Sequence, residues 1–142
     1  MGNAGALIGE VENIKSNDVK TFILGTVGMN DLVRPTLYDA HHDVLPVKNT
    51  DEAITADLVG PVCESGDYIA KNRPLPLLSR GDFFAIMSAG AYGMVQACTY
   101  NSRGLPAEVL VKGNNAYLIR ARQTIDDLID HDIVPYDLDW AD

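Results

Sequence analysis

Cysteine, basic side chains and long apolar runs are all scarce in this sequence of 142 residues. Its two cysteines, Cys63 and Cys98, show no Cys-x-x-Cys spacing and have no histidines at metal-site intervals, so the sequence predicts free thiols and no metal centre. The formal net charge of -9 disfavours binding to nucleic acid. No apolar run approaches the roughly 18 residues of a membrane span, and no charged segment followed by an apolar core opens the chain. These absences predict a soluble, cytoplasmic protein without membrane contact.

Length and composition indicate one compact domain over residues 1–142. A chain of this length can bury a sizeable core by itself, and no low-complexity linker or internal repeat divides it. Negative charge gathers near the C-terminus, and no lysine or arginine follows position 122. The aspartates in this region are Asp126, Asp127, Asp130, Asp132, Asp137, Asp139 and Asp142. This pattern is typical of a solvated acidic tail, which we place at residues 135–142.

Short apolar or alternating runs bounded by glycine, proline, asparagine or aspartate are typical of β-strands. Such runs predict strands at 22–24, 58–60, 83–87 and 94–100, and a hairpin of 108–112 with 116–122 around Gly113-Asn114-Asn115. Alternation in the last strand, of Tyr117, Ile119 and Ala121 with Leu118, Arg120 and Arg122, predicts that its far end is half exposed. The expected fold class is mainly β: an antiparallel, Greek-key-like barrel or sandwich with one or two short helices.

Two short helices are predicted. Thr124 can cap a helix together with Asp127, and Ile125, Leu128 and Ile129 form an apolar stripe by which this helix should dock before ending ahead of Pro135. The second helix runs from Pro35 to about Tyr38, because proline suits a first helical position. It would place Arg34 and Tyr38, which are four residues apart, on one face.

Arg34 and Tyr38 form the first candidate site. A guanidinium can hold a carboxylate through two parallel hydrogen bonds, and a phenol on the same face can add a third. Taken alone, however, an Arg-x-x-x-Tyr pair is more often structural, so both interpretations stay open at this point.

Cys63 and Glu64 form a second candidate, in the turn-like stretch Gly60-Pro61-Val62-Cys63-Glu64-Ser65-Gly66-Asp67. The thiol can donate a proton and the carboxylate can pair with an ammonium group. The alternative is a small buried cysteine next to a solvated acid.

Two further stretches carry polar or aromatic side chains that a site could use. Tyr92 lies in Ser88-Ala89-Gly90-Ala91-Tyr92-Gly93, whose small residues permit close backbone approach to a ligand, although a tyrosine fixed by packing in a tight bend explains the pattern equally well. The group His41-His42-Asp43 is better explained as a polar loop, because adjacent side chains in a strand point to opposite faces and cannot easily share a metal ion.

These motifs, with the stretch from Met29 to Tyr38, closely resemble the C-terminal domain of bacterial diaminopimelate decarboxylase over nearly the whole chain, from about Gly2 to Val134. That family is dependent on pyridoxal 5'-phosphate (PLP), belongs to the alanine-racemase-like fold group, and makes L-lysine from meso-2,6-diaminopimelate in the last step of lysine biosynthesis. The resemblance implies that Arg34 and Tyr38 bind the substrate carboxylate that is retained, helped by an arginine of another domain. It implies that Glu64 binds the distal ammonium, that Cys63 is the catalytic proton donor, and that Tyr92 contacts the PLP phosphate or lines the pocket for cofactor and substrate.

The resemblance also implies parts that this chain does not contain. The family carries its PLP-binding lysine on an N-terminal (β/α)8 barrel of about 250 residues. The five lysines here, Lys15, Lys20, Lys48, Lys71 and Lys112, do not match that motif. Residues 1–5 resemble the point at which the family's chain leaves the barrel domain. Cys63 and Glu64 are expected to reach the active site of a neighbouring subunit in a homodimer, and the isolated chain is expected to be inactive.

Two alternatives remain from the sequence. One is an ornithine- or arginine-type PLP decarboxylase domain, although the substrates of those enzymes have no distal carboxylate for Arg34 and Tyr38 to bind. The other is a non-catalytic module for dimerisation or regulation, against which the retention of Arg34, Cys63, Glu64 and Tyr92 counts.

Overall fold

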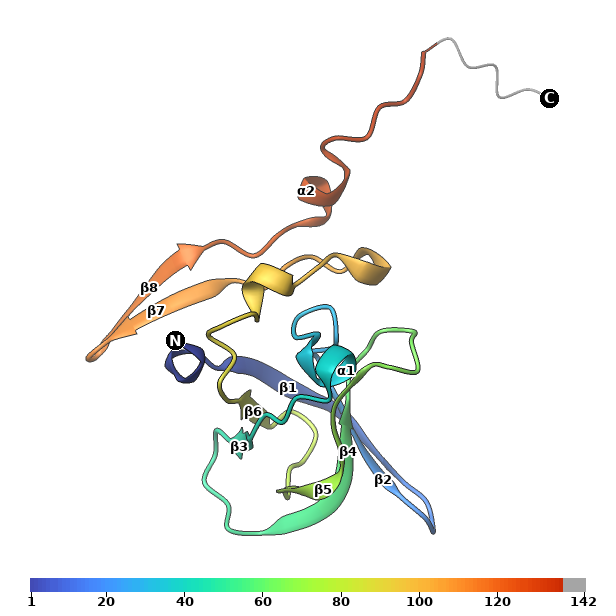
Figure 1. The fold of residues 1–142 in the computed structure, drawn as a ribbon, viewed down its shortest axis with the longest axis vertical. Helices are drawn as coiled ribbons and strands as arrows, with labels where there is room; N and C mark the ends of the chain where they lie inside the picture. The colour runs from blue at the N-terminus through green and yellow to red at the C-terminus, as the bar shows by residue number, and fades with distance from the viewer. Residues whose placement is uncertain (137–142) are drawn as a thin grey trace, which may run out of the picture.

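The computed structural model describes residues 1–136, and its main feature is a strongly curved six-stranded sheet (Figure 1). The strands are β1 (Leu7–Ser16), β2 (Thr21–Gly25), β3 (Val44–Pro46), β4 (Ala53–Val59), β5 (Tyr68–Pro76) and β6 (Phe83–Ile86), in the spatial order β3-β6-β1-β2-β4-β5. The sheet curls until its two edge strands, β3 and β5, contact each other, which gives a nearly closed barrel. The predicted mainly-β fold class is therefore confirmed.

Strand direction determines where the candidate residues lie. All neighbouring pairs in this sheet are antiparallel except β2 and β4, which run parallel. The carboxyl ends of parallel neighbours lie at the same edge of a sheet. The segment that leaves β2 therefore meets the turn 60–67 that leaves β4, and the first of these leads into helix α1 (Arg34–Tyr38). The parallel pair had not been predicted from the sequence.

The core fills the inside of this curved sheet. Side chains that are almost completely buried come from strands across the whole sheet, among them Ile23, Leu58, Ile69, Phe84 and Ile86. The ring of Phe84 occupies the space in which Gly9 and Gly25 lack side chains: a Cβ at either glycine would lie within 2.8 Å of the ring. The core thus uses glycine in two strands to admit one large side chain.

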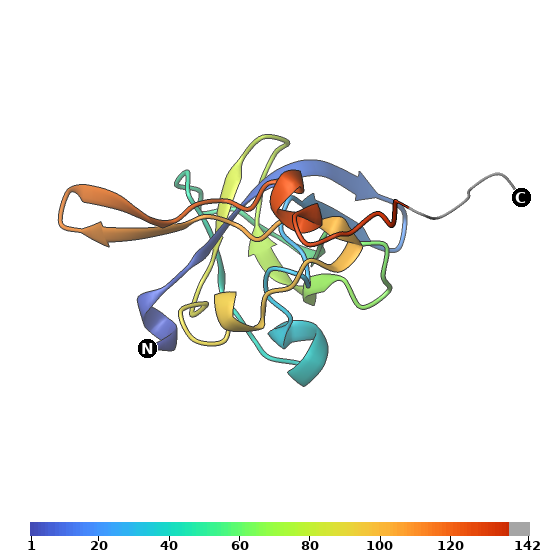
Figure 2. The ribbon, with the colours of Figure 1, turned by 90° about the horizontal axis from the view of Figure 1, so that it is seen from above.

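The C-terminal region, which we call the arm (residues 108–136), lies to one side of this barrel in Figure 1, and Figure 2 shows its hairpin projecting beyond the barrel. It contains the hairpin β7 (Glu108–Lys112) and β8 (Asn115–Arg120), then helix α2 (Ile125–Ile129). The hairpin is confirmed, with Gly113 in the left-handed conformation expected of its turn. The capping box of Thr124 and Asp127 is also confirmed. Two details were wrong: β8 is exposed throughout, and the stripe of α2 does not dock, since Ile125 and Ile129 remain more than half exposed.

The strand predicted at 94–100 does not form. This stretch contains two 3-10 turns, η2 (Met94–Gln96) and η3 (Tyr100–Ser102), and the Cys98 amide is bonded to the Asn30 carbonyl instead of a strand partner. At the other end of the chain, the 3-10 turn η1 (Gly2–Ala4) lies against residues 88–90. Among residues 1–136, no helix is long and apolar enough to cross a membrane.

Candidate functional site

Asp67 fastens the turn 60–67 to the segment that leads into α1. Its buried carboxylate accepts hydrogen bonds from the backbone amides of Met29 and Val62, both at 2.6 Å. Gly28 and Gly60 allow this approach, because a Cβ at either position would lie within 3.0 Å of the carboxylate oxygens. Burial raises the pKa of Asp67, and the two amide hydrogen bonds oppose that rise. The two loops are therefore one rigid unit, held by a residue to which the sequence had assigned no role.

Helix α1 presents Arg34 and Tyr38 on one face, as predicted. Proline in its first turn starts the helix, and Asp39 in the left-handed conformation ends it. The Arg34 guanidinium lies 5.8 Å from the centre of the Tyr92 ring, in cation–π geometry. The Tyr38 hydroxyl accepts a hydrogen bond of 3.4 Å from the Gln96 amide. We call these four residues, Arg34, Tyr38, Tyr92 and Gln96, the helix group.

Tyr92 has an unusual backbone conformation at its place in this group. Its φ of 62° lies in the left-handed region, which is uncommon for a bulky residue and is often found where function requires it. Its side chain is 60% exposed. The small residues around it serve a different purpose from the one expected: the backbone of residues 1–5 packs against Gly90, and the Ala89 carbonyl packs against Gly93. The close approach is therefore to this chain's own backbone.

Cys63 and Glu64 lie together on the exposed side of the turn. Both cysteines are free, as predicted, and both are exposed. The exposure contradicts the alternative of a buried packing cysteine at position 63. One oxygen of Glu64 accepts hydrogen bonds from Ser65 Oγ at 3.2 Å and the Gly66 amide at 3.3 Å, and the other accepts one from the Tyr100 hydroxyl at 3.4 Å. These bonds, led by that of Gly66, lower the pKa of Glu64. We call Cys63, Glu64 and Tyr100 the turn group.

The helix group and the turn group lie on different sides of α1. Thr36 Oγ1 donates to the Gly66 carbonyl at 2.5 Å, and the Tyr68 hydroxyl donates to the Pro35 carbonyl at 3.3 Å. Thr36 is two positions from both Arg34 and Tyr38, which puts it about 200° around the helix from them. No hydrogen bond or ion pair within residues 1–136 joins the two groups. The structure thus brings the predicted residues together as two sets.

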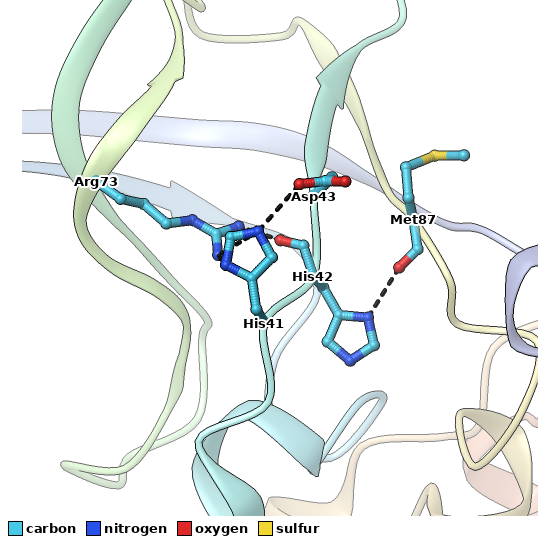
Figure 3. Close-up of polar contacts among 5 residues, drawn as sticks. All are labelled: His41, His42, Asp43, Arg73 and Met87. Carbon is cyan, nitrogen blue, oxygen red and sulfur yellow. Dashed lines mark hydrogen bonds and ion pairs between the residues drawn. The ribbon is translucent and has the colours of Figure 1, made fainter.

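The adjacent histidines separate as expected from their spacing (Figure 3). His41 is exposed, with its ring within hydrogen-bond distance of Asp43 at 3.0 Å and of Arg73 at 2.8 Å. His42 is buried, its Nδ1 donates to the Met87 carbonyl at 2.8 Å, and its own carbonyl accepts from Arg73. Within the described residues no group of three or more histidine, cysteine or acidic side chains has metal-site geometry. These contacts join β5 to the segment between α1 and β3.

Two residues of the site, Gln96 and Tyr100, were not found from the sequence. Both lie in the stretch that had been interpreted as a strand. Asn101 and Ser102, which directly follow Tyr100, are frequent turn residues and were the available signal against that strand.

The described part of the chain leaves the two groups open to solvent. Grooves of about 550 and 750 Å³ lie beside β1, the segment around 103–106 and the arm, and the five predicted site residues do not line them. Whatever binds at the helix group or the turn group is therefore not enclosed by these residues.

Comparisons with known proteins agree on one family. Residues 2–90 match the model described as pyridoxal-dependent decarboxylase, C-terminal sheet domain. A diaminopimelate decarboxylase of Zymomonas mobilis is 50% identical over 91% of this chain. The crystal structure of the M. jannaschii diaminopimelate decarboxylase in complex with L-lysine superimposes with a TM-score of 0.90, at 40% identity over 94% of this chain. A lysine/ornithine decarboxylase of Vibrio vulnificus complexed with cadaverine is more distant, at 26% identity and a TM-score of 0.63 over 71% of the chain.

These matches cover only a part of each relative. The chain spans 31% of the length of the Zymomonas protein, 31% of the M. jannaschii structure and 28% of the Vibrio structure.

Proposed function

The chain belongs to the pyridoxal-dependent decarboxylase family, as its C-terminal sheet domain, and from this membership we propose that it is part of a diaminopimelate decarboxylase. The reaction is the removal of CO2 from meso-2,6-diaminopimelate to give L-lysine. The observation that carries this proposal is the helix group, which combines a guanidinium and two phenols beside one another in a chain 50% identical to a diaminopimelate decarboxylase. We place the whole chain, residues 1–142, in one domain of the enzyme, with residues 1–5 at the junction with a barrel domain.

The helix group suits an anionic partner. No carboxylate within residues 1–136 lies at ion-pair distance from Arg34, so its charge is available for an external anion. In this proposal Arg34 and Tyr38 hold the distal carboxylate of the substrate, which is retained in lysine. The bidentate geometry of arginine fits a carboxylate closely, and Tyr38 adds a neutral donor.

Tyr92 is proposed to contact the PLP phosphate and to line the substrate pocket. Its exposed phenol next to a guanidinium fits a phosphate, since both supply hydrogen-bond donors to an anion. Bound PLP supplies the electron sink that accepts the electron pair released when CO2 leaves. We propose that the lysine that holds PLP lies outside this chain. In support, Lys20 is already paired with Asp57 at 2.6 Å and Lys71 lies over the Tyr68 ring.

The turn group is proposed to act on the other end of the substrate. Glu64, kept ionised by its hydrogen bonds, pairs with the distal ammonium, and Cys63 donates a proton to the carbon that has lost CO2. An exposed thiol in this role requires a reducing compartment, so a cytoplasmic location is part of the proposal.

We further propose that the turn group serves the active site of a second subunit in a homodimer. The separation of the two groups by α1 supports this assignment, because the helix group and the turn group lie on different sides of that helix within one chain. Two-fold symmetry would let each site receive one helix group and one turn group.

The two alternatives are disfavoured by specific observations. An ornithine- or arginine-type enzyme would leave the Arg34 and Tyr38 pair without a carboxylate to bind, and the relative of that type is the more distant one. A non-catalytic module would have no need for the left-handed Tyr92 beside Arg34 or for an exposed, ionised Glu64.

The proposal is tested in the full-length, PLP-loaded enzyme that contains this domain. We expect CO2 release from meso-diaminopimelate and much less from ornithine or arginine. Arg34→Lys keeps the charge but loses the two-donor fork, so KM should rise about 10- to 100-fold. Cys63→Ala should lower kcat by about 100-fold or more with a smaller change in KM. Glu64→Gln should raise KM and reduce discrimination against analogues without the distal amine.

Three results would contradict this assignment. Preference for ornithine or arginine would move the chain to the competing branch. Absence of turnover with every one of these amino acids would favour the non-catalytic module. Unchanged kinetics in all three variants would show that these residues do not form the site.

A further inference from the structure

The segment that carries Tyr100 is fixed at both ends to one buried residue. We call residues 98–103 the strap. The Cys98 amide donates to the Asn30 carbonyl at 2.9 Å, and Arg103 Nε donates to Asn30 Oδ1 at 3.2 Å. Arg103 also donates to the Thr26 carbonyl at 2.7 Å. Asn30 is 1% exposed, so the strap is anchored in the interior at the loop that precedes α1.

Between these anchors the backbone takes a costly path. Asn101 and Ser102 have φ of 58° and 55°, in the left-handed region, which is unfavourable for a residue other than glycine. Asparagine tolerates this conformation better than serine does. Two consecutive residues of this kind persist only where surrounding contacts enforce them, and the anchors of the strap are such contacts.

This path brings the Tyr100 hydroxyl to the carboxylate of Glu64. Tyr100 donates to Oε2 at 3.4 Å, whereas Ser65 and Gly66 both donate to Oε1. The two oxygens therefore differ: Oε1 has two donors from its own turn, and Oε2 has one donor from a segment 36 residues away. The negative charge of Glu64 raises the pKa of Tyr100, so its phenol stays protonated and remains a donor.

We propose that Tyr100 is a positioning residue that holds the Glu64 carboxylate in one orientation, with the free side of Oε2 directed to the distal ammonium of the substrate. This inference rests on the role of Glu64 in the proposed function. Tyr100 does not touch the reacting atoms; it determines how tightly the enzyme binds substrates that carry the second amine. The strap links this specificity to the interior of the domain through Asn30.

Tyr100→Phe in the full-length, PLP-loaded enzyme tests the inference, because it removes one oxygen and keeps the ring. We expect KM for meso-diaminopimelate to rise about three- to tenfold, while kcat changes less than about twofold. In wild type the hydrogen bond from Tyr100 helps to lower the pKa of Glu64. Without that bond, the Glu64 carboxylate of the variant should ionise at higher pH. The acid limb of kcat/KM should therefore move to higher pH. Tyr136→Phe, which removes a hydroxyl from a fully exposed tyrosine, is the matched control.

A double-mutant cycle separates positioning from a general structural effect. In a Glu64→Gln background, Tyr100→Phe should cause little further change in KM, because Tyr100 acts through the Glu64 charge. If the double variant raised KM by the product of the two single effects, the proposal would be overturned. Equal melting temperatures of wild type and Tyr100→Phe would show that the fold is intact.

A readout without turnover keeps this inference distinct from the proposed function. The pKa of Glu64 is measured by carbon-13 NMR of labelled glutamate carboxyls, with the resonance assigned by its loss in Glu64→Gln. A higher pKa in Tyr100→Phe supports the inference even if wild type fails to decarboxylate meso-diaminopimelate, a failure that would refute only the proposed function. An unchanged pKa in Tyr100→Phe overturns the inference.

Discussion

The barrel and the arm use apolar residues in opposite ways. In the barrel, residues 7–86, the large apolar side chains of neighbouring strands bury one another, and Leu58 and Phe84 are at most 1% exposed. In the arm, Val111 and Leu118 are both 67% exposed, and Ile119 is 62% exposed. The barrel therefore buries most of its large apolar side chains, although Ile8 and Phe83 stay about half exposed, whereas the arm leaves most of its own exposed.

The pairing within the hairpin makes this difference sharper. Val109 lies opposite Leu118, and Leu110 lies opposite Tyr117. Successive residues of a strand point to opposite faces, so both faces of this two-stranded sheet are apolar. A hairpin that faced water on one side would be polar on that side. The hairpin thus exposes apolar side chains on both faces, which teaches that a domain can fold around one core and still carry large apolar side chains outside it.

The largest predicted effect compares one leucine from each region. Leu58→Ala should lower the free energy of unfolding of the chain by about 2–5 kcal/mol, because it leaves a cavity in the core. Leu118→Ala, the matched change in the arm, should alter it by less than about 0.5 kcal/mol. Urea denaturation followed by circular dichroism measures both. Equal losses would mean that the arm shares the cooperative core of the barrel.

A smaller effect is expected where the two site loops are joined. Asp67→Asn replaces one accepting oxygen by an amino group that faces a backbone N–H, either that of Met29 or that of Val62. The loss should be about 1–3 kcal/mol in the same denaturation experiment. Asp51→Asn at an exposed position is the control. A loss no greater than that of the control would show that Asp67 does not hold the loops together.

The smallest expected effect is the pH dependence of stability, and its direction differs between the barrel and the arm. Burial raises the pKa of Asp31 and Asp67 in the barrel, so the folded state binds their protons more tightly than the unfolded state. Each therefore adds stability to the barrel as pH falls through its folded pKa toward the ordinary value of 3.8, and this contribution is lost as pH rises back through the folded pKa. Hydrogen bonds from Thr124 lower the pKa of Asp127 in the arm, so its contribution is lost as pH falls through its folded pKa.

Denaturation of wild type and Asp31→Asn across this range isolates one of these groups. As pH falls from 7 toward 3.8, the ordinary pKa of an aspartate, wild type should gain stability relative to the variant. A difference between the two proteins that stays constant over the range would contradict the assigned direction.

Local features were predictable from the sequence because short-range chemistry determines them. Arg34-Pro35 begins α1, Thr124 with Asp127 caps α2, and Gly113 turns the hairpin, each through contacts within a few residues. Long-range contacts could not be inferred in this way. The strand expected at 94–100 was lost to anchoring on Asn30. Strand β1 was missed because Glu10, Glu12 and Asn13 interrupt its apolar pattern, although Val11 is buried.

The same distinction between local and long-range contacts applies to the candidate site. The spacing of Arg34 and Tyr38 predicts that they share a face, and adjacency joins Cys63 to Glu64. The contacts of Arg34 with Tyr92 and of Glu64 with Tyr100 join residues distant in sequence, and no local pattern indicates them. Whether these residues act as proposed stays a prediction until the variants are measured.

The parallel pairing of β2 with β4 bears on how this domain folds. The hairpin of β1 and β2 closes through a short turn, whereas β4 can join β2 only after the segment 26–52 has looped back. Closing a long loop costs entropy before any contact compensates for it, so this pairing should come late in folding. That segment contains α1, and the turn 60–67 directly follows β4. Both halves of the site should therefore become ordered in the slow step of folding, and refolding experiments should recover the β1–β2 hairpin before the environment of Tyr38.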